Sequence, residues 1–104
     1  MIELVAFSKK RNVQAKAIFY SLNKIVVLKG SIISPETSIF KMALDAKKYR
    51  QDKKYISNNN VLQEDLEFKS SSAAAQFVSG YSVNGFNYWK NPQGTKLGEL
   101  IKKK

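Results

Sequence analysis

The chain has 104 residues, and its 43% hydrophobic and 25% charged residues are typical of one folded domain over residues 1–104 rather than of a disordered segment. It contains no cysteine and no histidine, which excludes disulfides, thiolate chemistry, thiolate-ligated zinc and histidine-dependent catalysis. Eighteen Lys and Arg against eight Asp and Glu give a formal net charge of +10, so the expected partner is a polyanion such as nucleic acid.

The first residues argue against export or membrane insertion. The apolar run after Met1 is short, carries Glu3 and has no basic region ahead of it, unlike a signal peptide. No segment approaches the ~20 apolar residues of a membrane-spanning helix. We therefore expect a cytoplasmic protein without membrane contact, and no pattern in the sequence calls for a cofactor.

The first third of the chain predicts three antiparallel strands. Residues 2–7, 13–20 and 24–28 are apolar, alternating or β-branched, with polar residues 9–12 and Leu22-Asn23 as the breaks between them. Connections this short join antiparallel neighbours, so the expected arrangement is a meander.

A long central helix is expected next. Ser34-Pro35-Glu36 is a suitable opening, with Thr37 or Ser38 as later alternatives for the cap, and residues 58–60 (NNN) are the expected stop. The apolar face expected for it consists of Ile39, Met42, Ala43, Ala46, Tyr49 and Ile56. The fold class is therefore α+β: a small antiparallel sheet packed against a long central helix and a short C-terminal helical unit.

The second half predicts a capped helix. After an acidic connector over residues 61–68, which fits a loop with a short strand, one serine among Ser70, Ser71 and Ser72 caps a helix that Gly80 ends. Asn84-Gly85 predicts a tight turn before an extended segment over residues 86–90. Thr95 can cap a last short helix.

A serine, alanine, glycine and tryptophan pattern runs through this half of the chain. It consists of Phe68, residues 70–75 (SSSAAA), Gly80, Asn84-Gly85, Trp89-Lys90, Gly94 and Leu97; residues 14–17, residues 27–34 and Arg50 also fit. The pattern resembles a bacterial domain of unknown function found at the C-terminus of GIY-YIG-type nucleases and in restriction-modification proteins. It is also similar to the RAMA (restriction enzyme adenine methylase associated) domain.

The resemblance covers residues 13–100 and departs from the family at Ser71, often proline, and at Phe86, commonly tryptophan. No GIY-YIG catalytic block precedes the domain in this sequence. The resemblance therefore implies a non-catalytic accessory module that helps an attached or separate enzyme to engage DNA.

Carboxylates near the capped helix allow a catalytic alternative. Asp65, Glu67 and Lys69 could hold Mg²⁺ as the last part of a PD-(D/E)xK nuclease, but no Pro-Asp precedes them, and solvated charge on a connector is the favoured interpretation. We expect no metal and no catalytic residue. Ser70–Ser72 are expected mainly to cap the helix, and with Lys69 they are also a hypothetical phosphate site.

Other candidate nucleic-acid contacts come from two further places. Lys9, Lys10 and Arg11 form a basic cluster at an expected hairpin tip, for which solubility charge is an equal alternative. Asn87 and Lys90 are candidates for contacts in a groove of DNA, whereas Trp89 is expected to be buried rather than to stack on a base.

The function expected from these features is a non-catalytic basic DNA-binding accessory domain that contacts the phosphate backbone. The alternative is a protein-interaction module that docks on a nuclease, a methyltransferase or a phage or host factor. A minimal metal-dependent nuclease is the weaker alternative.

Overall fold

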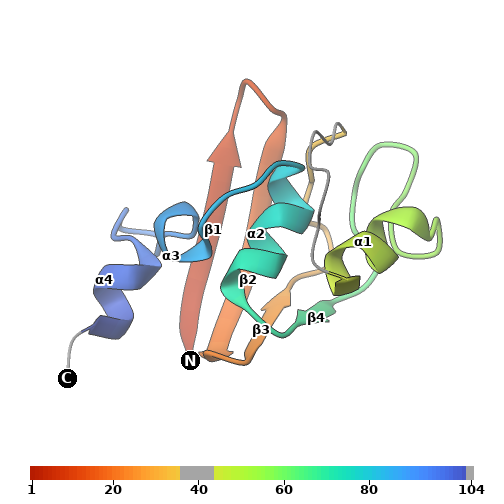
Figure 1. Ribbon diagram of the computed structural model, residues 1–104. Coiled ribbons are helices and arrows are strands. Elements are labelled where there is room, and N and C mark those ends of the chain that lie inside the picture. Colours follow the sequence, from red (N-terminus) through yellow and green to blue (C-terminus); the bar gives the residue numbers. More distant parts are fainter. Residues whose placement is uncertain (36–43, 103–104) are drawn as a thin grey trace.

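A computed structural model of the protein describes residues 1–35 and 44–102. Within these ranges the chain forms one antiparallel sheet in the order β1-β2-β3-β4 and four helices (Figure 1). The strands are β1 (Ile2–Ser8), β2 (Val13–Ser21), β3 (Lys24–Val27) and β4 (Leu66–Phe68). The α+β class is confirmed, and so are the three N-terminal strands.

Alternation along β2 divides the sheet into two faces. Val13, Ala15, Ala17 and Phe19 are buried, and the residues between them are more exposed. The same period of two holds in β1, where Leu4 and Ala6 are buried. The buried face carries the helices and the core, and no helix of residues 1–35 and 44–102 covers the other face, which is called the helix-free face below.

The sheet extends beyond the expected meander. β4 pairs with β3 in the register Ile25↔Phe68, Val26↔Glu67 and Val27↔Leu66. Leu66 and Phe68 are buried while Glu67 is exposed, so the acidic connector contains a strand that buries its apolar residues. The long connection between β3 and β4 includes α1.

The expectation of a long central helix is wrong at its C-terminal end. Helix α1 (Leu44–Gln51) stops seven residues before Asn58 because Asp52 Oδ1 accepts a hydrogen bond from the Lys54 amide at 2.9 Å and turns the chain. Ile56 instead pairs with Leu62 in an isolated bridge. Ser34 and Pro35 of the expected opening are not helical, and the part of the expected helix with Ile39, Met42 and Ala43 lies outside the described residues.

The asparagines at 58–60 belong to a different turn. Asn60 has φ of 64°, the left-handed conformation that asparagine tolerates, and its amide bonds the Ser57 carbonyl at 3.0 Å. Asn60 therefore reverses the chain between two short bridged segments, not at the end of a helix.

Helix α2 (Ser71–Ser79) crosses the middle of the sheet and closes the core (Figure 1). Ser70 is its N-cap, and Gly80 ends it at φ of 80°, as the sequence predicts. Its three alanines and Phe77 are buried, and the small side chains let the helix approach the sheet closely. Tyr49 of α1 packs edge-on against Phe68 and Phe77 at centroid distances of 5.3 and 6.2 Å.

The segment after α2 is helical where a turn and an extended segment are expected. Asn84 Oδ1 accepts from the Phe86 amide at 2.8 Å and caps α3 (Gly85–Tyr88), so Asn84-Gly85 is a helix start and not a hairpin turn. Helix α4 (Leu97–Lys102) is the expected last helix. Trp89 is fully buried between them, which confirms its predicted structural role.

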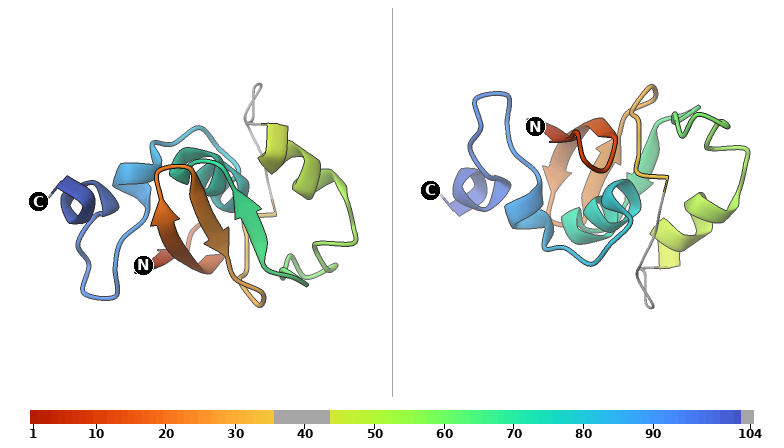
Figure 2. Two further views of the ribbon diagram at one scale, coloured as in Figure 1. Left: turned by 90° about the horizontal axis from the view of Figure 1, so that it is seen from below. Right: turned by 90° about the horizontal axis from the view of Figure 1, so that it is seen from above.

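The helix-free face lies behind α2 in the view of Figure 1, and Figure 2 shows all four helices away from it. The loop between α3 and α4 extends past β1 toward this side in both views of Figure 2. None of the helices in the described ranges is long and apolar enough to cross a membrane.

Candidate nucleic-acid interface

The expected basic hairpin tip is present at residues 9–12, between β1 and β2. Lys9 and Lys10 are exposed there, and Asn12 adopts φ of 60°. Arg11 is partly buried, with its guanidinium 3.9 Å from the centre of the Tyr81 ring. Two lysines are therefore available to a ligand, whereas Arg11 also ties the tip to the segment after α2.

The three serines at the start of α2 have structural partners. Ser70 Oγ accepts from the Ala73 amide at 3.0 Å, and Ser72 Oγ accepts from the Gly85 amide at 3.0 Å. Ser71 is buried, and its carbonyl accepts from Trp89 Nε1 at 3.1 Å.

α3 also covers the first turn of α2. A Cβ added at Gly85 would lie 2.3 Å from the Ser71 carbonyl carbon and 2.5 Å from the Ser72 nitrogen. Lys69 beside this turn is exposed, and its amide donates to Asp45 Oδ2 at 3.2 Å. The phosphate contact suggested for Lys69 and Ser70–Ser72 stays a prediction, in which Lys69 is the exposed member.

The acidic residues near β4 have different environments. Asp65 Oδ1 accepts from the Lys29 amide at 2.7 Å, and Glu67 is exposed on the strand itself. Across residues 1–35 and 44–102, no three acidic side chains come together in a group that could hold a metal ion.

Lys90 joins a row of lysines that crosses the outer edge of the sheet. Val5 pairs with Lys16 of β2 on one side and with Lys90 on the other, where the Val5 and Lys90 backbones exchange hydrogen bonds of 2.7 and 3.2 Å. Lys90 in turn pairs with Lys96. Because paired residues of antiparallel strands point to the same face, Lys16, Lys90 and Lys96 all lie on the helix-free side with Val5.

The lysine row (Lys16, Lys90 and Lys96) shares its face with Glu3, which lines a hollow together with Lys16. All three side chains are exposed, and none forms an ion pair with any acidic residue of the described ranges. Like charges directly opposite each other across two strands are unfavourable, and Lys90 and Lys96 are such a pair. An anion bound between them would remove this repulsion.

Shallow hollows continue the row into a groove across the helix-free face. One of about 430 Å³ lies between Pro92 and Leu28 and has Val5, Lys16 and Ile18 in its lining. A second of about 310 Å³ shares Lys16 and Leu28 with it, and a third of about 220 Å³ shares Val5 and Pro92. The three hollows together are called the sheet groove below.

The comparison with known proteins gives a family. The model of a domain of unknown function (DUF4357) matches residues 5–101. The chain belongs to the DUF4357 family. No curated protein and no solved structure matches this DUF4357 domain.

The DUF4357 chain does not bring all the sequence-predicted residues together. The hairpin tip lies at the end of the sheet where α2 finishes, and Lys69 lies at the opposite end, where α2 begins. Asn87 is exposed on α3 and lines none of the three hollows of the sheet groove. Among the predicted residues, Lys90 is the one on the sheet groove.

Two lysines of the row were missed by the sequence interpretation. The alternation along β2 could have placed Lys16 on the exposed face, because its neighbours Ala15 and Ala17 are small and apolar. No local pattern could have placed Lys96 opposite Lys90, since that pair depends on the turn at Pro92.

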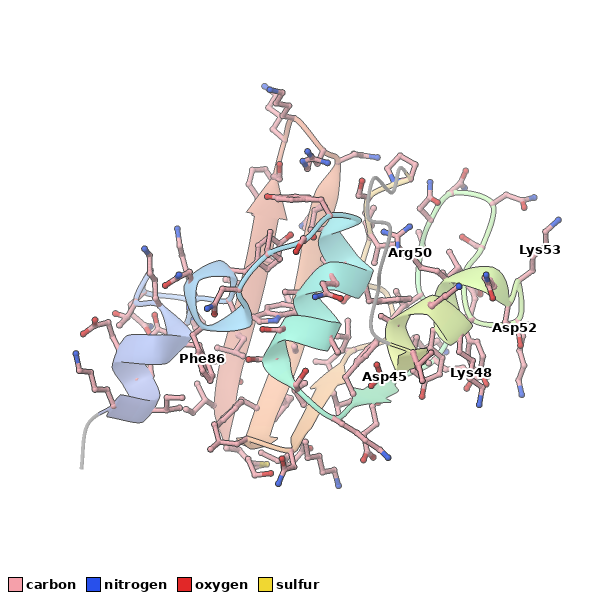
Figure 3. The ribbon with its side chains drawn as sticks, in the orientation of Figure 1. Asp45, Lys48, Arg50, Asp52, Lys53 and Phe86 are labelled. Atoms are coloured by element: carbon pink, nitrogen blue, oxygen red, sulfur yellow. The ribbon has the colours of Figure 1, made fainter. Side chains whose placement is uncertain are left out.

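Two other ionisable groups, Arg50 and Tyr88, are partly buried. Burial lowers the pKa of Arg50 to about 10, and its Nε and Nη2 donate to the carbonyls of Phe77 at 2.8 Å and Ser34 at 2.9 Å. Burial also raises the pKa of Tyr88 to about 12. Figure 3 shows Arg50 between α1 and α2, with Lys48 and Lys53 pointing away from the domain.

Proposed function

We propose that this chain is a non-catalytic, basic DNA-binding accessory domain that contacts the phosphate backbone. The lysine row carries the proposal, because it places three cations without an ion-pair partner on one sheet face that no helix of the described residues covers. Phosphate contacts by lysine supply most of the sequence-independent affinity of proteins for DNA. The net charge of +10 adds long-range attraction to the same partner.

The other basic residues extend this interface in the proposal. Lys9 and Lys10 continue β1 beyond the sheet groove and can reach a neighbouring phosphate, with Arg11 fixing the tip. Lys69 and Asn87 supply peripheral contacts. Ser70 then contributes by capping α2 through its hydroxyl, and Ser71 and Ser72 by joining α2 to Trp89 and α3.

The setting of the domain is also part of the proposal. The resemblance to domains at the C-terminus of GIY-YIG-type nucleases and to RAMA domains suggests a partner enzyme of nuclease or restriction-modification function. Such a domain would work in the cytoplasm, where it would hold DNA for an enzyme attached to it or bound separately.

The test is a fluorescence-anisotropy titration of labelled duplex DNA at about 50 and 200 mM salt. Because log affinity falls by about 0.9 per neutralised phosphate for each tenfold rise in salt, three contacts predict a loss of about 40-fold over this range. A triple variant of the row, Lys16→Gln, Lys90→Gln and Lys96→Gln, should bind weakly and with a salt slope closer to zero.

The matched control is Lys47→Gln, Lys48→Gln and Lys53→Gln, which removes the same charge from exposed positions on and after α1. The control should keep most of the affinity and the salt slope. Equal losses in both triple variants would show that net charge alone drives binding, and the assignment to the row would be wrong. No binding at 50 mM salt would refute the DNA-binding proposal.

A protein partner is the second candidate, and one observation favours it. Phe7 is 73% exposed on the helix-free face, two residues from Val5 along β1, which is a surface suited to a partly apolar contact. A docking module of this kind would be indifferent to DNA at either salt concentration.

A further inference from the structure

We infer that the sheet groove binds single-stranded nucleic acid in preference to duplex, with a base stacked on Phe7 and phosphates on the lysine row. The inference rests on the proposed function and adds the form of the ligand. It depends on features other than charge: the exposure of one aromatic ring, the width of the groove and the position of a second ring.

Phe7 is placed for stacking rather than for the core. It lies on β1 two residues beyond Val5, about 7 Å along the strand from the lysine row, and on the same face. The hollow of about 220 Å³ beside it is lined by Phe7, Lys90 and Pro92. The Phe7 ring is 73% exposed, so a base can stack on it. The phosphate of the same nucleotide can then contact the lysines of the row, which form no ion pair.

The sheet groove is about as wide as a single strand of nucleic acid. The hollow of about 430 Å³ lies over β1 and β2; Glu3, Val5, Lys16 and Ile18 of these strands line it, together with Pro92 and Leu28 outside them. Strands in a sheet are spaced about 4.8 Å apart, so a floor of two strands is about 10 Å across. A duplex presents phosphates outward and keeps its bases stacked inside, so it could use the lysines but not Phe7.

A second aromatic extends the track along β2. Tyr20 is 46% exposed on the helix-free side, and Lys24 Nζ lies 5.1 Å from the centre of its ring. Gln14 is the partner of Phe7, and six residues of strand separate it from Tyr20, which corresponds to about 20 Å. The two rings with the lysine row between them therefore suit a bound segment of several nucleotides.

The experiment compares a labelled 12-nucleotide oligothymidine with a 12-base-pair duplex at about 50 mM salt. The wild-type protein should bind the single strand more tightly. Phe7→Ser should weaken binding of the single strand about tenfold, the effect of losing one base–aromatic stack, and should leave duplex affinity within about twofold. Phe86→Ser is the matched control, because Phe86 is exposed on α3 away from the groove.

A second variant gives a direct readout. Phe7→Trp keeps a stacking surface and should retain single-strand affinity, and its exposed indole should be quenched by the oligothymidine but not by the duplex. Trp89 is fully buried, so the wild-type emission should not respond. Circular dichroism and melting temperatures confirm that each variant is folded.

The outcomes separate this inference from the proposed function. If the lysine-row variant loses duplex binding while Phe7→Ser changes neither affinity, the single-strand inference is wrong and the DNA-binding proposal stands. Tighter binding of the duplex than of the single strand would also overturn the inference. If neither nucleic acid binds at 50 mM salt, both fail, and the face is left to a protein partner.

Discussion

Gly85 is the position where the contact between α2 and α3 can be tested most sharply. A Cβ there would stand 2.3 Å from the Ser71 carbonyl carbon, 2.5 Å from its oxygen and 2.5 Å from the Ser72 nitrogen. All three are backbone atoms of α2, so no side-chain rotation can relieve the overlap. Gly85→Ala should therefore push α3 away from α2 by about 1 Å, to reach an ordinary contact distance.

That displacement has a calculable cost. It would break the Gly85 amide bond to Ser72 Oγ at 3.0 Å and the Trp89 Nε1 bond to the Ser71 carbonyl at 3.1 Å, each contributing about 1 kcal/mol. Overpacking adds about 1 to 3 kcal/mol, so we expect a destabilisation of about 3 to 5 kcal/mol. For a domain of this size the melting temperature should fall by more than about 12 °C.

The assay is urea and thermal unfolding followed by circular dichroism and by Trp89 emission, which should shift to longer wavelength as α3 moves. Helix propensity predicts the opposite sign, because alanine is favoured over glycine in helices by about 1 kcal/mol. Gly98→Ala in α4 is the control: its nearest contact is 3.3 Å from Phe86 Cβ, and it should be nearly neutral. A Gly85→Ala protein as stable as the wild type would refute the close packing of α3 on α2.

Four further outcomes are expected. Ser72→Ala should cost about 1 to 2 kcal/mol in urea unfolding, because it leaves the Gly85 amide without its partner, whereas alanine at exposed Ser82 should have little effect. Since the pKa of Tyr88 is raised in the folded state to about 12, stability should decline from pH 10 to 12, and Tyr88→Phe should flatten that decline in pH-dependent urea midpoints. Arg50→Met should lower the melting temperature by about 5 °C or more, because two carbonyl groups lose their donor, and an unchanged value would contradict that role. Plasmid DNA should stay intact with Mg²⁺, and nicking that Glu67→Ala abolishes would instead establish the nuclease alternative.

Residue patterns in the sequence predicted the parts of the fold that depend on residues close together in the chain. The alternation in β2 and the cap and stop of α2 at Ser70 and Gly80 are visible as residue types in fixed order. The end of α1 was missed because the Asp52 side chain competes for a backbone amide at a position where apolar periodicity still favours helix. Nothing near Leu66 in sequence indicates that this segment pairs with β3.

The candidate site was harder to predict from the sequence, because it also depends on contacts between segments that are far apart in the chain. Lys90 could be named from its residue type beside Trp89. Its place in the lysine row, however, depends on its pairing with Val5, which lies 85 positions away in the chain. The serines show the converse case: their hydroxyls suggested both a helix cap and a ligand, and Ser70 and Ser72 accept hydrogen bonds from the protein's own amides. Spacing along the chain predicts the cap at Ser70 but not the role of Ser72, because its partner, the Gly85 amide, is brought to it by tertiary packing.

The pairing of Lys90 with Val5 also bears on how this domain avoids self-association. It occupies the middle of the outer edge of β1, and the opposite edge strand, β4, is three residues long and carries Glu67. Long, unpaired strand edges are templates for adding a strand from another chain, and short, charged or blocked edges are not. Both edges of this sheet are therefore poor templates for a strand from a second molecule, which disfavours growth into a continuous sheet when the domain is joined to an enzyme or present at high concentration.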